Sequence, residues 1–160
     1  MAVDMFMKID DIKGESADDK HKGEIDVYSW SWGATQTGSS QTAQGSGTGK
    51  ANVSDLTFTT RLESSHAPLL GMLLKGKPFK QALLTLRKAG DKPLEYLKIT
   101  MSNGIISGVQ FSGTPSDEYQ TASVTLNFGQ VKFDYTPQAA DGSGQATISY
   151  GHDIAANKPL

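Results

Sequence analysis

The chain has 160 residues, a length that predicts one domain over residues 1–160. Its formal net charge is −2 and it has no cysteine, which argues against a nucleic-acid partner and excludes disulfides, zinc–thiolate sites and thiol nucleophiles. Apolar residues make up 37% of the chain, and the abundance of glycine, serine and threonine favours many short strands over a helical bundle.

The first elements in chain order are a strand and a charged loop. Residues 3–9 alternate polar and apolar side chains, which predicts a strand and is unlike a secretory signal peptide. No stretch approaches the roughly 20 apolar residues that cross a bilayer, so we expect no membrane insertion. Residues 10–24 are rich in carboxylates, but their spacing does not match a calcium loop and lysines are interleaved, so we expect a solvated loop.

The next segment, EIDVYSWSWG, carries both tryptophans and organises the predicted fold. Because residues i and i+2 of a strand share a face, Trp30 and Trp32 project to one side together with Tyr28. Ser29 and Ser31 project to the opposite side. We therefore expect a sealed aromatic face and an exposed face of small hydroxyls.

The apolar positions of this segment change phase by one residue between Val27 and Tyr28, which predicts a β-bulge or a bend from one sheet to another. Residues 34–49 follow, and they contain no charged and no large apolar residue, so they predict a long extended loop. The end of this loop, GSGTGK, departs from the phosphate-binding consensus at two positions. We expect no nucleotide and no other cofactor.

Residues 53–62 alternate apolar side chains with threonines and predict a strand. Residues 65–75 form the one predicted helix, which Ser65 can cap and Gly76 ends. One face of this helix carries an apolar stripe at i, i+3 and i+4, and we expect it to pack on the flank of the β structure: Leu69, Met72 and Leu73.

The remainder of the chain alternates strands and turns. Asn103-Gly104 lies between two alternating runs and predicts a tight hairpin turn. Gly129 lies where a long run shifts its apolar phase, and it predicts a glycine bulge in a bent strand. The predicted strands of this half are residues 80–88, 94–101, 105–111, 120–135 and 146–150.

Eight or nine strands with hairpin-like spacing and one helix indicate a mainly β fold. We expect an antiparallel β-barrel or two-sheet sandwich, with the helix over residues 65–75 on its flank and the extended loop over residues 34–49. Five large side chains lie on the apolar faces of the most regular strands and are the expected core anchors: Trp30, Trp32, Phe58, Leu126 and Phe128.

Residues that could carry out chemistry are scattered. The three histidines, His21, His66 and His152, lie in a charged loop, at a helix start and in the tail, without metal-ligand spacing. No G-x-S-x-G nucleophile motif is present, so we expect neither a catalytic nor a metal site. Paired tryptophans can form a carbohydrate platform, although a core role is more common for strand indoles.

Several motifs occur together in an order and spacing that resemble one family. They are MAVDMFMKIDDIKGES, EIDVYSWSWG, GKANVSDLTFT, LTLRKAG and VTLNFGQVKFDYTPQAADG. They resemble the haemolysin-coregulated protein (Hcp) family, the tube proteins of the bacterial type VI secretion system, over nearly the whole chain. The resemblance implies a barrel of two sheets with a flanking helix, hexameric rings, and stacking of the rings into a tube.

The resemblance also implies a cytoplasmic stage followed by secretion without a signal peptide, a spike protein at the tube tip, a contractile sheath outside the tube and small effector proteins in the lumen. In such a ring the hydroxyl face lines the lumen, with Ser31 and then Ser29 as the positions expected to contact cargo. Simple exposure to solvent is an equally good interpretation of these serines. The residues 34–49 would reach a neighbouring subunit or ring through Gln36, Thr37, Ser40, Gln41, Gln44 and Thr48.

Two alternatives stay open at the level of sequence. A phage-type tail tube protein would share the architecture and carry no cargo. A β-sandwich carbohydrate-binding module would use the tryptophans as a binding platform.

Overall fold

The computed structural model describes residues 2–36 and 51–160. The prediction of a mainly β fold with one helix is confirmed. In chain order the elements are β1 (Val3–Ile9), β2 (Ile25–Asp26), β3 (Ser29–Ser31), β4 (Ala34–Thr35), β5 (Asn52–Val53), β6 (Leu56–Arg61), α1 (His66–Lys75), β7 (Pro78–Lys88), β8 (Leu94–Ser112), β9 (Thr121–Tyr135), β10 (Ile148–Asp153) and β11 (Lys158–Pro159).

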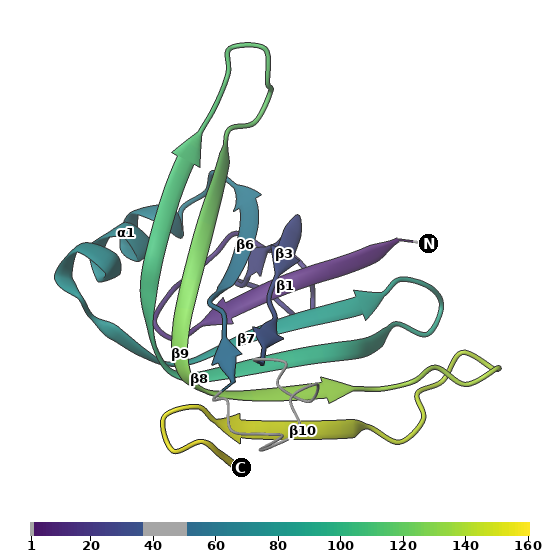
Figure 1. Cartoon of the computed structure of the whole chain (residues 1–160). Coiled ribbons are helices and arrows are strands. Elements are labelled where there is room, and N and C mark those ends of the chain that lie inside the picture. Colours follow the sequence, from purple (N-terminus) through teal and green to yellow (C-terminus); the bar gives the residue numbers. More distant parts are fainter. Residues whose placement is uncertain (1, 37–50) are drawn as a thin grey trace.

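Nine strands form one antiparallel sheet, with the path β11-β10-β9-β8-β7-β1-β2 and with β6 on β9 and β3 on β6. One edge of β9 pairs with β8 along its length, while the other pairs with β6 in its first half and with β10 in its second. The β8–β9 pair therefore belongs to two half-sheets. We call the one that continues into β7, β1, β2 and β10 the lower half-sheet, and the one that continues into β6 and β3 the upper half-sheet. In Figure 1 the first half of β9 rises beside β6, and its second half turns to run beside β10.

The two half-sheets do not close into a barrel, because in the described ranges the pairing path has free ends at β2, β3 and β11. Of the two arrangements that the sequence left open, the structure has the two-layer one, with strands shared between the layers. The core lies between the layers.

The bend between the half-sheets lies where Asn103 and Gly129 oppose each other. Asn103 has a left-handed φ of 57°, and a Cβ on Gly104 would lie 2.3 Å from the ring of Phe79 and 2.4 Å from the carbonyl oxygen of Asn127. The predicted hairpin at Asn103-Gly104 is wrong, because β8 continues through both residues. The left-handed residue and the missing side chain allow a paired strand to bend, as they would allow a turn.

The predicted glycine bulge at Gly129 is also wrong. The β8–β9 pairing keeps its register on both sides of Gly129 and shifts instead between Ile106 and Gly108. The phase change of β9 comes from the bend itself, since the two halves of the strand belong to different layers.

The predicted change of sheet between Val27 and Tyr28 is confirmed. The backbone N–H of Val27 donates to the carbonyl of Met5 in β1 at 2.9 Å, and that of Tyr28 donates to Thr59 in β6, also at 2.9 Å. The chain therefore leaves the lower half-sheet and joins the upper one between two consecutive residues.

Helix α1 packs against β8 through the predicted stripe, with Leu69 and Met72 buried and Leu73 partly buried. Gly76 ends the helix with a left-handed φ of 65°, as its position predicts. The predicted cap differs, since Ser65 occupies the cap position but donates its hydroxyl to Glu63 Oε1 at 2.6 Å.

The C-terminal strand begins later and is longer than predicted, because β10 starts at Ile148 and pairs with β9 up to Asp153. The predicted polar tail contributes a short strand of its own. Its residues turn back so that Lys158 pairs with Asp153 and Pro159 pairs with His152.

Candidate functional site

Two rows of residues, most of them serine or threonine, cover the outer face of the upper half-sheet. Cross-strand pairing places these residues in two rows over β3, β6, β9 and β8, because directly paired residues share a face. The first row is Ser29, Thr59, Ser123 and Gln110, and the second is Ser31, Thr57, Thr125 and Gly108. We call these two rows the hydroxyl face.

Hydrogen bonds between neighbouring side chains hold the hydroxyl face together. Ser29 bonds to Thr59, and Thr57 bonds to Thr125 at 3.2 Å. Gly108 completes the second row without a side chain, and a Cβ there would lie 3.3 Å from Cβ of Thr125. Ser29 and Ser31 are exposed, so the two serines named from the sequence lie at the open end of this surface.

Charged side chains border the hydroxyl face beside the two ends of β6. At one end Asp55 accepts hydrogen bonds from Asn127 Nδ2 at 2.7 Å and from Ser107 at 2.8 Å. At the other end the guanidinium of Arg61 lies 4.3 Å from the ring centroid of Tyr119. Between these two positions the rows of the hydroxyl face are polar and contain no charged side chain.

The two indoles lie on the opposite, inner face of β3. Trp30 pairs with Phe58, and the ring of Trp32 lies 6.3 Å from that of Phe128 while its Nε1 donates to the carbonyl of Ser54 at 3.0 Å. The expectation that both indoles are sealed inside is wrong, because each is only half-buried against the core. Among the described strands β3 pairs only with β6, so the side of β3 away from β6 leaves part of Trp30, and of Trp32 directly after the strand, exposed.

The other expected core anchors lie deeper. Phe58, Leu126 and Phe128 are buried in the core cluster, on β6 and β9. Tyr28 shares the parity of the indoles but is exposed, because it lies at the point where the chain changes half-sheet.

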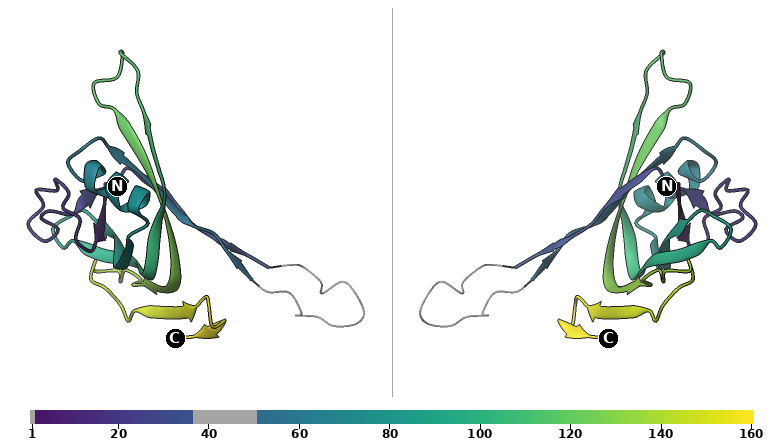
Figure 2. Two further views of the ribbon diagram at one scale, coloured as in Figure 1. Left: turned by 90° about the vertical axis from the view of Figure 1, so that its left-hand side faces the viewer. Right: turned by 90° about the vertical axis from the view of Figure 1, so that its right-hand side faces the viewer.

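The chain around β4 and β5 forms a separate two-stranded arm. Ala34 pairs with Val53 and Thr35 with Asn52, and the arm projects away from the body of the molecule (Figure 2). The hydroxyl of Ser54 anchors its base, because it accepts from the N–H of Gly33 at 3.0 Å and donates to that residue's carbonyl at 2.7 Å. Gln36 is exposed beyond β4, and the other candidate contact residues of this segment lie outside the described residues: Thr37, Ser40, Gln41, Gln44 and Thr48.

A second surface was missed at the level of sequence, and it lies on β9 and β10. One row of paired residues crosses six strands, and its first four members, on β2, β1, β7 and β8, are buried. Its last two, Phe133 and Tyr150, are 39% and 60% exposed. The full row is Ile25, Met7, Leu84, Ile99, Phe133 and Tyr150.

The neighbouring row repeats this change from buried to exposed. Leu86 and Leu97 are buried, whereas Tyr135 and Ile148, paired with each other on β9 and β10, are exposed. The core-facing side of the lower half-sheet thus continues past the cover that residues 2–36 and 51–160 provide. We call Phe133, Tyr135, Ile148 and Tyr150 the open apolar face.

The histidines do not come together in the fold. In the described part of the chain, no group of three or more metal-ligating side chains is close enough to hold an ion. Nor does any helix within residues 2–36 and 51–160 have the length and apolar character needed to span a bilayer.

Comparison with known proteins gives a consistent result. The family described as "Type VI secretion system effector, Hcp" matches residues 6–135. The chain is 47% identical to protein hcp1 of Pseudomonas aeruginosa over 159 residues, which is 98% of each chain.

Solved structures agree with the sequence comparison. The crystal structure of Hcp1 from Salmonella typhimurium is 38% identical, with a TM-score of 0.80 and complete coverage of both chains. A structure described as a type six secretion system protein is 29% identical with a TM-score of 0.92, and the match covers 99% of this chain and 100% of the other.

Proposed function

Because the chain belongs to the Hcp family, the secreted tube proteins of type VI secretion, which are structural rather than enzymatic, we propose that it assembles into hexameric rings that stack into the inner tube of this system. Small effector proteins ride in the lumen of this tube. A spike protein at its tip and a contractile sheath around it complete the assembly, and the subunit passes from the cytoplasm to the outside without a signal peptide.

The open apolar face is the observation that supports assembly most directly. Soluble monomers seldom expose large contiguous apolar surfaces, and such surfaces mark contact sites. Here two adjacent rows of a sheet are buried over four strands and exposed over the last two. Seating a second copy on β9 and β10 would complete the cover, and a head-to-tail contact of this kind generates a closed ring when its rotation closes.

The hydroxyl face supports a role as the lumen wall. A wall along which other proteins travel must stay wet and must lack large apolar side chains, and the centre of this surface meets both requirements. Ser31 and Ser29 lie at its open end and are the proposed cargo contacts. The projecting arm would then connect a subunit to its neighbour or to the next ring, through Gln36 and the residues that follow it.

Negative-stain electron microscopy of the purified chain tests the assembly. The proposal predicts rings with an open centre in end-on views. Particles of monomer size without rings, at every concentration, would contradict it.

Cargo transport has its own test. Ser31→Gln places a longer side chain on the hydroxyl face and should abolish co-purification of an effector with the rings, while the rings still form. Ser116→Gln, on the exposed tip between β8 and β9, is the matched control and should leave co-purification unchanged. Rings from which no effector is ever recovered would favour a phage-type tail tube protein without cargo.

A further inference from the structure

Residues 10–24, between β1 and β2, form an irregular strap that lies against the lower half-sheet. The N–H of Gly14 donates to Gly23 at 2.7 Å, and the N–H of Ser16 donates to Glu24 at 2.9 Å. A Cβ on Gly14 would lie 2.4 Å from the carbonyl oxygen of Glu24, so the two arms of the strap touch. The strap does not pair with the sheet as a strand. The N–H of Asp10, at its start, donates to the carbonyl of Gln81 in β7 at 3.1 Å, and side chains make further attachments along its length.

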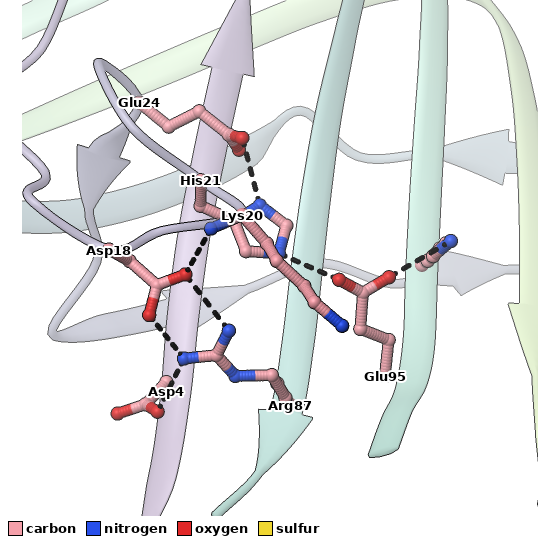
Figure 3. A network of polar contacts seen from close by, with 8 residues as sticks. Asp4, Asp18, Lys20, His21, Glu24, Arg87 and Glu95 are labelled. Atoms are coloured by element: carbon pink, nitrogen blue, oxygen red, sulfur yellow. Dashed lines mark hydrogen bonds and ion pairs between the residues drawn. The ribbon is translucent and has the colours of Figure 1, made fainter. Parts of the chain in front are cut away.

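Arg87 of β7 makes the first attachment. Its guanidinium donates to both carboxylate oxygens of Asp18 in the strap, at 2.9 Å and 2.6 Å, and to Asp4 of β1 at 3.0 Å (Figure 3). An arginine keeps its charge over the whole physiological pH range, so the guanidinium in this attachment does not change its protonation state.

His21 makes the second attachment, and its geometry is different. Its Nδ1 lies 2.8 Å from Oε2 of Glu24 in the strap, and its Nε2 lies 2.7 Å from Oε1 of Glu95 in β8 (Figure 3). The imidazole is buried and stacks on the ring of Phe6, with the centroids 4.3 Å apart and the planes at 10°. Both ring nitrogens therefore face a carboxylate at hydrogen-bond distance.

The β7–β8 pair places the two attachments side by side. Arg87 and Glu95 are cross-strand partners, and the register of the pair shifts directly beside them, between Leu86 and Arg87. Glu95 also contacts Lys98 at 3.1 Å. Burial raises the pKa of Glu95, but hydrogen bonds from Lys98 and His21 outweigh it, so the net pKa is lowered and the carboxylate is charged at neutral pH.

Counting protons shows which state of His21 the site fits. An ionised carboxylate can only accept hydrogen bonds, and a neutral imidazole has one donor and one acceptor. Only the imidazolium, with two N–H donors, satisfies Glu24 and Glu95 together. The neutral ring leaves one nitrogen lone pair directed at a carboxylate oxygen inside a buried site, which is unfavourable.

We propose that His21 makes the strap a pH-sensitive latch, which is closed while the imidazolium bridges Glu24 and Glu95 and loosens when the ring loses a proton. The charged groups around the ring are Glu24, Asp18 and Lys20 of the strap, Arg87 of β7, Glu95 and Lys98 of β8 and, through Arg87, Asp4 of β1. The latch concerns only the strap, so it stands whether or not the hexameric ring is found.

Trypsin offers a direct readout, because Lys13, Lys20 and Lys22 of the strap are exposed while the strap's backbone is held in place. Cleavage at these lysines, relative to a free peptide of residues 10–24, should rise about tenfold from about pH 6 to about pH 8, as expected for the loss of one charge-assisted hydrogen bond. In His21→Gln the relative rate should be high at all pH values. His152→Gln, on β10, is the control and should behave like the wild type.

Glu95→Gln distinguishes a proton-dependent latch from a merely structural contact. A glutamine amide can donate or accept, so a neutral imidazole then satisfies both neighbours, and the pH dependence of cleavage should disappear with the strap still protected. NMR of the ring nitrogens gives a second readout that needs no variant. It should show both nitrogens protonated at the pH at which the strap resists trypsin. A neutral ring at that pH, or a relative cleavage rate that does not change with pH in the wild type, would overturn the proposal.

Discussion

Arg87 is the side chain on which acidic residues from two separate segments converge. Its hydrogen bonds lower the pKa of Asp18 to about 2, from an ordinary value of 3.8, and the same contacts raise the pKa of the arginine. A carboxylate whose pKa is lower in the folded state contributes stability above the unfolded pKa, and this contribution is lost as the pH falls through the folded pKa. The window for Asp18 therefore runs from about pH 4 down to about pH 2.

Asp18→Asn should accordingly lower the thermal midpoint at neutral pH, because the charge-assisted bonds to Arg87 are weakened. The difference from the wild type should shrink as the pH falls through this window, and calorimetry over a pH series measures it. Asp19→Asn removes an adjacent negative charge while the hydrogen bonds from Arg87 to Asp18 and Asp4 remain, so it is the matched control. A deficit in Asp18→Asn that persists unchanged below the window would argue against this assignment.

Gly104 illustrates how one missing side chain permits the bend of the sheet. Gly104→Ala would force a Cβ to within 2.3 Å of the Phe79 ring and 2.4 Å of a backbone oxygen, so we expect a loss of stability. Overpacking of this kind costs about 1–3 kcal/mol. Gly33→Ala, where a Cβ meets nothing within 4 Å, should be close to neutral. Chemical denaturation of both variants checks the contrast, and equal stabilities would contradict this account of the bend.

At the scale of elements, helix α1 has a buried side and an exposed side that differ sharply. Leu69 is fully buried against the sheet, whereas Leu74 is 74% exposed. Leu69→Ala should therefore destabilise the protein by about 2–5 kcal/mol. Leu74→Ala should change stability by less than about 0.5 kcal/mol. Urea unfolding of the two variants measures the difference, and a similar cost for both would mean that the helix docks differently.

Sequence patterns predicted the individual strands and the helix better than the bends and turns that connect them. The alternation of β1 and the break at Val27 and Tyr28 could be predicted, because burial on one side of a strand leaves a period of two in the sequence. Asn103-Gly104 could not be assigned correctly, since a left-handed asparagine followed by glycine serves a hairpin and a bent strand equally well. The pairing of β8 along its full length decides between them, and that pairing is a long-range property.

The candidate site was predicted in part for the same reason. Ser29 and Ser31 could be placed opposite the indoles from local alternation alone. Their threonine neighbours, Thr57 and Thr125, are brought beside them by pairing between distant strands, which no local pattern encodes. The open apolar face was missed because Phe133 and Tyr150 have the alternation of buried residues, and only the ends of the sheet show that nothing in the described chain covers them.

For the whole molecule, the proposed ring depends on a second copy covering the open apolar face. Tyr150→Gln together with Phe133→Gln replaces two large, partly exposed apolar side chains. The two residues lie on β10 and β9, whose pairing is made by backbone hydrogen bonds and does not need these side chains. We expect the proposed rings to dissociate while the subunits stay folded, because the buried part of the core is unchanged. Circular dichroism checks the fold, and sedimentation velocity checks the assembly. Leu74→Gln, which replaces a still more exposed apolar side chain on α1, is the control and should retain the ring.

The absolute mass of the purified wild-type chain, measured by light scattering behind a sizing column, tests the central claim most directly. We expect a particle of about six times the 17.1 kDa subunit mass, since the proposed head-to-tail contacts through one repeated surface close into a ring. A mass of one subunit at every concentration tested would contradict it.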